Sequence, residues 1–344
     1  MAEPFFSLSR QDQGEVLETI RALTGRPEHL LEKDAWIVWL ISNLFESGLG
    51  MALTFSGDAT LSKVFRILDR FSDNIILAYD IRSLAGDLDA CQDMHFVRGT
   101  GRWIGMVLQR QSAWIEAAII PILEAAMKRD GLLGELELAG DSRDALLVRY
   151  QPTGSGTRYI APAVKLGFGP TVVEWPSVVA QITCDMDGCF PGVSFPKASP
   201  RVASVTWSFW EKALIAHVCC LHGDMCQAGY SSHWSDLATL SRTEYFEQAI
   251  RNRDVAHAVA RNKSHFLVEK GRGAEVVDFA SAANGYLRIV PDGETLAALA
   301  TDYAALAEGQ MMLGDAPTFE SVVLACRKVE ALANRAACSS GGMS

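Results

Sequence analysis

The chain has 344 residues, of which 49% are hydrophobic and 21% charged, a balance that is typical of folded globular proteins and excludes a wholly disordered chain. At about 100–200 residues per domain, this length predicts two domains. The 31 basic and 41 acidic side chains give a net charge of −10, so the chain lacks a general electrostatic attraction for nucleic acid and DNA binding is not expected.

Neither a membrane span nor a secretory signal is predicted. The densest apolar stretch near the start covers residues 35–45 and is interrupted by Ser42 and Asn43, whereas a span needs about 18–20 apolar residues. Residues 1–10 lack a basic region followed by an apolar stretch. We therefore expect a cytoplasmic protein that makes no membrane contact, with its eight cysteines present as reduced thiols and mostly packed as small apolar side chains.

The first half of the chain is predicted to alternate helices with strands. The first helix is predicted over residues 9–24, opened by Ser9 with Asp12 three positions on, a pair like a capping box. The elements predicted after it are a helix over 30–46, a strand over 52–55, a turn over 56–58, a helix over 60–68, a strand over 75–79, a helix over 101–129 and strands over 134–140, 145–151 and 158–168, with a hairpin turn at Gly154 and Gly156.

A stretch rich in Pro and Gly from 172 to 201 marks the expected junction between two domains. After it every strong pattern is helical, over residues 205–222, 232–240, 243–250, 254–262, 275–286, 292–307 and 318–337. The sequence therefore predicts a mixed α/β domain over residues 1–200, a helical domain over 203–337 and a small, polar, frayed tail over 338–344.

Two local patterns carry candidate chemistry. Residues 55–63 read as a strand, a glycine turn and a helix start, which can present backbone N–H groups to a phosphate, although an ordinary strand-to-helix connection has the same pattern. A second group of candidate ligands is His217, Cys219, Cys220, His222 and Cys226. All five stand at the end of one predicted helix, whereas structural zinc sites usually take their ligands from two short segments separated by a longer loop. A helix end with some side chains in the core and others on the surface is therefore preferred to a zinc site.

Several short motifs occur in a family order between about residues 28 and 335. They are LEKD (31–34), TLSK (60–63), RFSD (70–73), VKL (164–166), FWEK (209–212), Ser231 and His233 with DL (236–237), LRIVP (287–291), DY (302–303) and MM (311–312). As an ordered set, they resemble the AbiEii/AbiGii-type nucleotidyltransferase toxins. The resemblance implies a nucleotidyltransferase core with a small mixed sheet, followed by a helical domain. It also implies a toxin–antitoxin or abortive-infection setting with a cognate antitoxin, and Mg²⁺-dependent nucleotidyl transfer from an NTP, in some members to tRNA.

The same resemblance implies roles for named residues. The implied nucleotide contacts are Gly57, Asp58, Thr60, Lys63 and Ser72, with Lys165 as a further phosphate contact beside the metal strand. The candidate supporting residues are Glu211, Lys212, His233 and Asp236. For these four, structural roles are the preferred interpretation: an ion pair between Glu211 and Lys212, and a contact between domains for His233 and Asp236.

The metal ligands of the family are missing from their expected positions. The resemblance implies two aspartates one residue apart on a strand and a third acid on a neighbouring strand, because Mg²⁺ prefers carboxylate oxygens. Here the three positions are Asn74, Ile76 and Gly167. The second glycine of the family's turn is Asp58, whose charge we expect to repel a triphosphate. These departures predict a catalytically degraded protein.

Two aspartates near the strand are candidate replacements. In a regular strand Asp73 points to the face opposite Asn74 and Ile76 unless a bulge turns it, and Asp80 lies about 13 Å beyond Ile76. Three hypotheses stay open: a degraded transferase that keeps the family shape, an active transferase with relocated ligands, and a partner-binding scaffold that uses its helical part alone.

Overall fold

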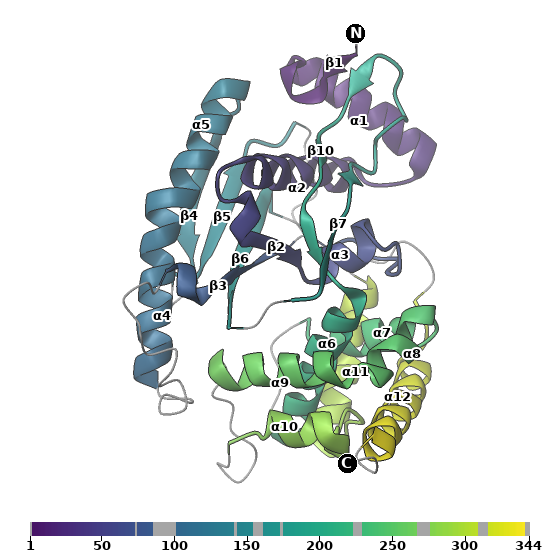
Figure 1. Cartoon of the computed structure of the whole chain (residues 1–344). Helices are drawn as coiled ribbons and strands as arrows, with labels where there is room; N and C mark the ends of the chain where they lie inside the picture. The colour runs from purple at the N-terminus through teal and green to yellow at the C-terminus, as the bar shows by residue number, and fades with distance from the viewer. Residues whose placement is uncertain are drawn as a thin grey trace.

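The computed structural model describes residues 2–72, 74–84, 101–140, 143–153, 161–172, 175–222, 229–266, 276–308 and 316–340. In the first part of the chain, helices alternate with strands (Figure 1): β1 (Glu3–Pro4), α1 (Arg10–Thr24), α2 (Glu28–Glu46), β2 (Leu53–Ser56), α3 (Asp58–Lys63), β3 (Asn74–Asp80), α4 (Gly101–Trp114), α5 (Ile120–Asp130), β4 (Gly134–Ala139), β5 (Ala145–Tyr150) and β6 (Ala163–Thr171). A π-helical stretch, Ile115–Ile119, joins α4 to α5.

Short strands and then helices make up the rest: β7 (Ser177–Val179), β8 (Ile182–Thr183), β9 (Val193–Ser194), β10 (Lys197–Ala198), β11 (Arg201–Ala203), α6 (Val205–His222), α7 (Ser231–Leu240), α8 (Glu244–Arg251), α9 (Arg253–Phe266), α10 (Phe279–Ser281), α11 (Gly293–Glu308) and α12 (Phe319–Ser340). The helices α6 to α12 lie together at the C-terminal end of the molecule (Figure 1). Division of the chain into two domains at about residue 200 stays a prediction.

The main sheet has seven strands in the order β4-β5-β6-β3-β2-β11-β7. It is mixed: β3 runs parallel to β6 and β11 parallel to β2, while the other neighbours are antiparallel. The mixed α/β class predicted from the sequence is thus confirmed. The stretch over 172–201, predicted as a junction, also contributes β7 to the edge of this sheet, and β11 follows directly at Arg201.

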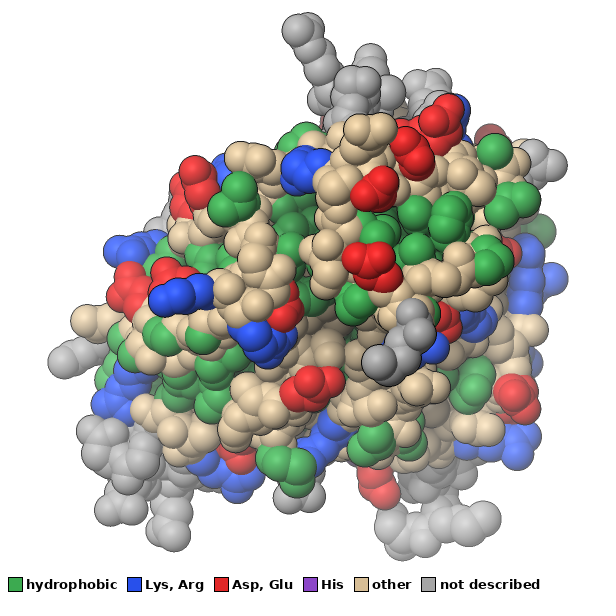
Figure 2. Space-filling model, turned by 90° about the horizontal axis from the view of Figure 1, so that it is seen from above, with side chains coloured by type: hydrophobic (Ala, Val, Ile, Leu, Met, Phe, Trp, Pro, Cys, Tyr) green, Lys and Arg blue, Asp and Glu red, His purple; other side chains and the backbone are tan. Residues whose placement is uncertain are grey.

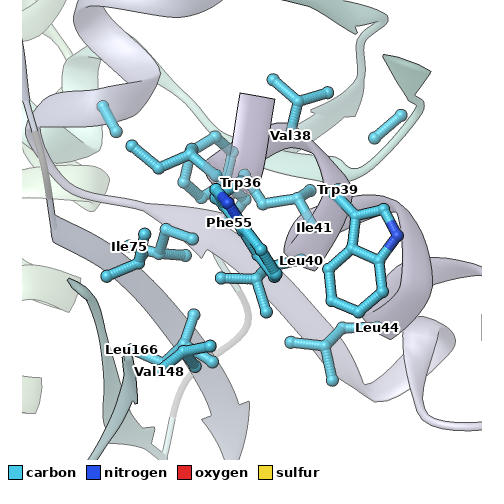
Figure 3. Close-up of a cluster of buried hydrophobic side chains, with 14 of the residues drawn as sticks. Trp36, Val38, Trp39, Leu40, Ile41, Leu44, Phe55, Ile75, Val148 and Leu166 are labelled. Atoms are coloured by element: carbon cyan, nitrogen blue, oxygen red, sulfur yellow. The ribbon is translucent and has the colours of Figure 1, made fainter. Parts of the chain in front are cut away.

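One face of the sheet is covered by α2, whose side chains are apolar around most of the helix (Figure 3). Phe55, Ile75 and Leu166, from three adjacent strands, are fully buried in the same cluster as the α2 side chains. Trp36 of α2 stacks on Tyr150 of β5 with ring centroids 5.0 Å apart. A helix buried on nearly all sides explains why its sequence lacks a clear polar face.

A second apolar cluster is built by the C-terminal helices and contains three fully buried tryptophans. Because a buried indole needs a partner for its N–H, two of them donate to backbone carbonyls: Trp210 to Ala249 at 2.8 Å and Trp234 to Ile289 at 2.7 Å. These bonds fix α6 against α8, and α7 against the segment that precedes α11. Among the described helices, none has the length and apolar character that crossing a membrane requires.

Several sequence predictions need correction. The helix predicted over 60–68 ends at Lys63, because the chain turns sharply there and Arg66 adopts a left-handed backbone conformation with φ of 53°. In the segment predicted as one helix over 275–286, regular helix starts only at Phe279 and turns π-helical at Ala282. Of the predicted frayed tail over 338–344, residues 338–340 are helical and residues 341–344 lie outside the described residues. The hairpin turn at Gly154 and Gly156 lies outside the described residues.

The prediction of reduced cysteines is also wrong at one position. Cys219 is disulfide-bonded, whereas Cys184, Cys189, Cys326 and Cys338 carry free thiols. The disulfide removes the Cys219 thiolate from any set of zinc ligands. In the part of the chain that the structure describes, no group of three His, Cys, Asp or Glu side chains is arranged to hold a metal ion.

Candidate functional site

The strand register brings the three predicted carboxylate positions together. Ile76 of β3 lies opposite Gly167 of β6, and Asn74 lies opposite Lys165. Because side chains alternate along a strand, positions 74, 76 and 167 share one face of the sheet, the face opposite α2. Asn74 and Lys165 are exposed, and Ile76 is half-buried. Asp73 lies outside the described residues.

Ile76 fills the space between these strands and the glycine turn. A Cβ atom added to Gly167 would lie 2.8 Å from Ile76 Cδ1, and one added to Gly57 would lie 3.0 Å from Ile76 Cγ1. Gly57 has a φ of 84°, so the tight turn between β2 and α3 also favours glycine by its backbone. The three positions where Mg²⁺ would need carboxylates therefore carry the amide of Asn74, the alkyl side chain of Ile76 and no side chain at Gly167. These residues do not fit the metal.

This packing predicts a specific energetic coupling. We expect Gly167→Ala to lower the free energy of unfolding by about 0.5–1.5 kcal/mol, because the added methyl group overlaps Ile76 Cδ1 and the end of that side chain must leave its favoured rotamer. In an Ile76→Ala background the same substitution should cost less, giving a coupling energy of about 0.5–1 kcal/mol. Urea denaturation of the four proteins measures it. Purely additive effects would show that Ile76 does not occupy this space.

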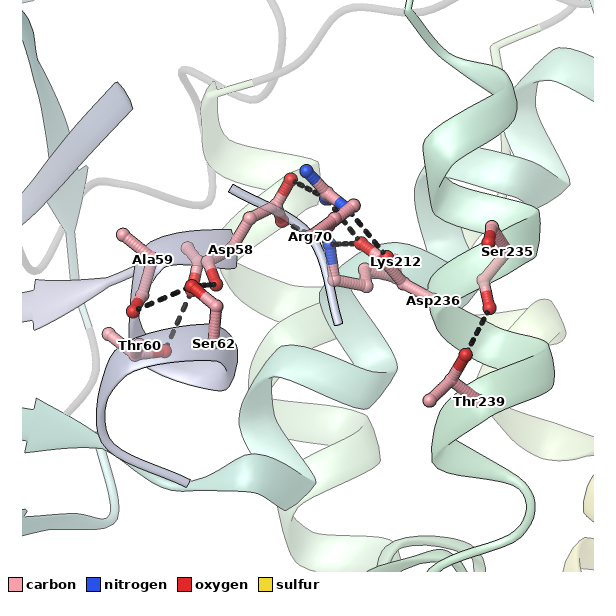
Figure 4. Close-up of polar contacts among 10 residues, drawn as sticks. Asp58, Ala59, Thr60, Ser62, Arg70, Lys212, Ser235, Asp236 and Thr239 are labelled. Carbon is pink, nitrogen blue, oxygen red and sulfur yellow. Dashed lines mark hydrogen bonds and ion pairs between the residues drawn. The ribbon is translucent and has the colours of Figure 1, made fainter. Parts of the chain in front are cut away.

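Next to the glycine turn, four charged side chains from distant parts of the chain form a cluster (Figure 4). Arg70 binds Asp236 through Nε at 3.0 Å and through a terminal nitrogen at 2.8 Å, and that nitrogen also lies 2.5 Å from Asp58. Lys212 Nζ pairs with Asp236 at 2.7 Å and with Asp58. The cluster joins α3 and the segment before β3 to α6 and α7.

The charges of this cluster balance, with two carboxylates and two cations. Burial alone would raise the pKa of the Asp58 carboxyl, but Lys212 and Arg70 outweigh it and hold that pKa well below its usual range. Burial alone would lower the pKa of the Lys212 ammonium, but Asp236 and Asp58 raise it. Asp58 is therefore a neutralised anion and not the free negative charge that its sequence position suggested.

His233 of α7 faces the same cluster and is held in its neutral form. Burial, followed by the charge of Lys212, lowers the pKa of His233 to about 4. The helical spacing predicted from the sequence therefore brings His233 and Asp236 to the same group of charges. Glu211, in contrast, pairs with Lys263, whose Nζ lies 3.9 Å from Glu211 Oε1, whereas Lys212 pairs with Asp58 and Asp236.

A second charged cluster holds Lys63, the lysine of the TLSK motif. Lys63 Nζ pairs with Asp34 of α2 and lies 3.5 Å from Asp185, which also pairs with Arg26. The Asp185 backbone N–H donates to Asp34 at 2.7 Å. Burial alone would lower the pKa of Lys63, but Asp34 and Asp185 raise it. This buried lysine already pairs with two carboxylates, so a phosphate would have to compete with them for it.

A cavity of about 90 Å³ lies between the two clusters. Its lining includes Arg26, Lys63, Arg66 and Arg70 together with Ser62 and Ser72. Ser72, an implied nucleotide contact, is thus brought to the cavity. Thr60 is not, because its hydroxyl donates to the Gly57 carbonyl at 2.7 Å and closes the turn.

The sequence analysis did not identify four members of these clusters as site residues: Arg70, Asp34, Asp185 and Arg26. Arg70 and Asp34 stand inside the RFSD and LEKD motifs, so a signal for them was present. Asp185 lies in the Pro- and Gly-rich stretch, and no sequence pattern marked it.

Comparison with known proteins gives a family. The chain matches the family model described as nucleotidyl transferase AbiEii toxin, type IV toxin–antitoxin system, over residues 39–325. The chain therefore belongs to the AbiEii nucleotidyltransferase toxin family. Among solved structures, it is similar to the nucleotidyltransferase toxin MenT4 from Mycobacterium tuberculosis H37Rv, with 14% identity and a TM-score of 0.47 over 96% of this chain and 94% of that one. No curated protein sequence matches it.

Proposed function

We propose that this chain is a member of the AbiEii family that has lost metal-dependent nucleotidyl transfer and acts by binding. The observation that carries the proposal is the packing of Ile76 against Gly57 and Gly167. Transfer of a charged phosphoryl group depends on metal ions that neutralise the charge and on a cradle that positions it. Here an apolar side chain occupies the place of a metal ligand, and the third ligand position carries no side chain.

The ion pairs of the cations near this site support the same proposal. Lys63 is paired with the buried carboxylate of Asp34 and the half-buried carboxylate of Asp185, and Lys212 and Arg70 are paired with Asp58 and Asp236. Each of these cations already has an anionic partner, so a triphosphate would have to displace a carboxylate to reach it. Lys165 alone among the implied phosphate contacts is exposed beside positions 74 and 76.

Relocated metal ligands are the second candidate, and the described residues do not favour it. Asp80 shares the sheet face of Asn74 and Ile76 but forms a surface ion pair with Arg82, at the far end of β3. Asp58 and Asp236 are engaged with cations, as described above. The remaining candidate is Asp73, which a substitution tests directly.

We expect no labelling of tRNA or of the protein itself when the purified chain is incubated with Mg²⁺ or Mn²⁺ and each labelled NTP. The reason is that position 76 is alkyl and position 167 has no side chain. An active family enzyme assayed in parallel serves as the positive control. Metal-dependent labelling that Asp73→Ala abolishes would establish the relocated-ligand alternative and overturn the proposal.

The family description implies an antitoxin partner, and we propose that this chain retains antitoxin binding in the cytoplasm. Both apolar clusters consist of well-buried side chains, and in the second cluster the indole N–H groups of Trp210 and Trp234 are hydrogen-bonded, so the cores beneath the protein's surface are intact. Co-purification with the product of the neighbouring gene, in the absence of any nucleotide, tests this part. Acidic and basic side chains are interspersed on the face shown in Figure 2, so that view gives no reason to favour RNA as the partner.

A further inference from the structure

We propose that Asp58 is a built-in anion that occupies a phosphate-binding position between Lys212 and Arg70 and keeps free phosphates out of it. The proposal concerns those two cations alone. It does not depend on whether the residues at positions 74, 76 and 167 can hold a metal ion.

The first step is the geometry of the cation pair, Lys212 and Arg70. Both side chains are nearly inaccessible, with exposed fractions of 4% for Lys212 and 8% for Arg70, and each contacts one oxygen of the Asp58 carboxylate: Lys212 contacts Oδ1 and Arg70 contacts Oδ2. A planar guanidinium beside an ammonium, with their donors converging on one anion, is an arrangement that also suits a phosphate group. The position is therefore chemically an oxyanion site with a side chain inside it.

The second step is charge. Asp236, 1% exposed, also binds both cations, but it can neutralise only one of them. Without Asp58, the cluster would hold one buried positive charge in excess, and burying an unpaired charge is costly. The cluster would then favour uptake of an anion from solution.

The third step is access. Asp58 is 27% exposed, far more than the other three members of the cluster, so it forms the outer wall between the cation pair and solvent. Arg70 also lines the cavity of about 90 Å³, together with Ser62 and Ser72. A phosphate that replaced the Asp58 carboxylate would therefore have a path to solvent.

The test compares four proteins in a buffer free of phosphate and sulfate: the wild-type chain, Asp58→Asn, the double variant Asp58→Asn/Lys212→Met and Asp80→Asn. The probes are inorganic phosphate, pyrophosphate and ATP without metal, each matched for ionic strength with NaCl. Asp80→Asn is the control, because it removes one carboxylate from a surface ion pair elsewhere on the chain. The double variant restores charge balance by removing one cation together with the anion.

We expect pyrophosphate to raise the melting temperature of Asp58→Asn by about 3 °C or more over NaCl, and to leave the other three proteins unchanged. A response to ATP as large as that to pyrophosphate identifies a nucleotide site, and a response to inorganic phosphate alone identifies a simple oxyanion site. If Asp58→Asn folds only when pyrophosphate is present, the proposal is equally supported.

Two results would overturn the proposal. The first is a melting temperature of Asp58→Asn that pyrophosphate raises no more than it raises that of Asp80→Asn. An Asp58→Asn protein that stays unfolded with pyrophosphate, while the double variant folds, would count against the proposal in the same way. The other is a wild-type chain that already binds pyrophosphate at this position, because Asp58 would then not exclude it. None of these measurements depends on nucleotidyl transfer, so their outcome is independent of the outcome of the labelling assay.

Discussion

Replacing Lys212 by methionine is expected to lower the free energy of unfolding by about 3–5 kcal/mol, the largest loss of stability among the single substitutions considered. Lys212 is 4% exposed and lies between the carboxylates of Asp58 and Asp236. Methionine keeps most of the side-chain volume but leaves these two anions with Arg70 as their shared cation. One buried carboxylate then loses its compensating charge.

The matched control is Lys263→Met, on α9. Lys263 Nζ lies 3.9 Å from Glu211 Oε1, with both side chains more accessible than Lys212, and such a pair contributes about 0–1 kcal/mol. Urea denaturation of both variants gives the comparison. If the two substitutions cost the same, the cluster would not hold α3 and the segment before β3 against α6 and α7 as the contacts indicate.

The sequence predicted the local elements because their signals are local. The apolar circumference of α2, the glycine turn after β2 and the strand around Ile76 all came from residues within a few positions of one another. The helix after the turn was predicted too long, because periodicity does not register the left-handed backbone at Arg66. The edge strand β7 and its neighbour β11 were missed as members of the main sheet, since short pairings depend on partners far along the chain.

The candidate site could be predicted only as a set of motifs. Substitutions at Asn74, Ile76 and Gly167 were visible by position, and the register confirms that the three positions adjoin. The partners of Asp58 were not visible, because Lys212 is 154 residues away and no pattern links the two. Charge alone suggested repulsion at this position, and only the fold shows that two cations meet the carboxylate.

The largest expected gain of activity is in a fourfold variant: Asp58→Gly, Asn74→Asp, Ile76→Asp and Gly167→Glu. We expect it to bind Mg²⁺ and to show metal-dependent labelling that the wild-type chain lacks. Positions 74 and 76 share one face of β3, and position 167 lies opposite 76 on β6, about 5 Å away across the sheet. Three carboxylates would therefore converge where Mg²⁺ needs hard oxygen ligands.

Each substitution in the set has a structural reason. Ile76→Asp supplies a ligand and also removes the atom, Cδ1, that a side chain at position 167 would meet at 2.8 Å. Asp58→Gly releases Lys212 and Arg70 to meet a phosphate, which the wild-type carboxylate prevents by occupying them. Ile76 is half-buried, so a carboxylate there stays close to solvent and its cost is moderate.

The control is the threefold variant that keeps Ile76, which retains the overlap with position 167 and lacks the central ligand. Calorimetry with Mg²⁺ and labelling with NTPs are measured on both proteins after circular dichroism shows that they are folded. Because a metal ligand contributes several kcal/mol to a phosphoryl-transfer transition state, and about 1.4 kcal/mol is tenfold in rate, the two variants should differ by at least a hundredfold. A folded fourfold variant that binds neither Mg²⁺ nor NTP would show that the loss extends beyond these four positions, and the chain would then be better described as a binding scaffold with no latent transferase site.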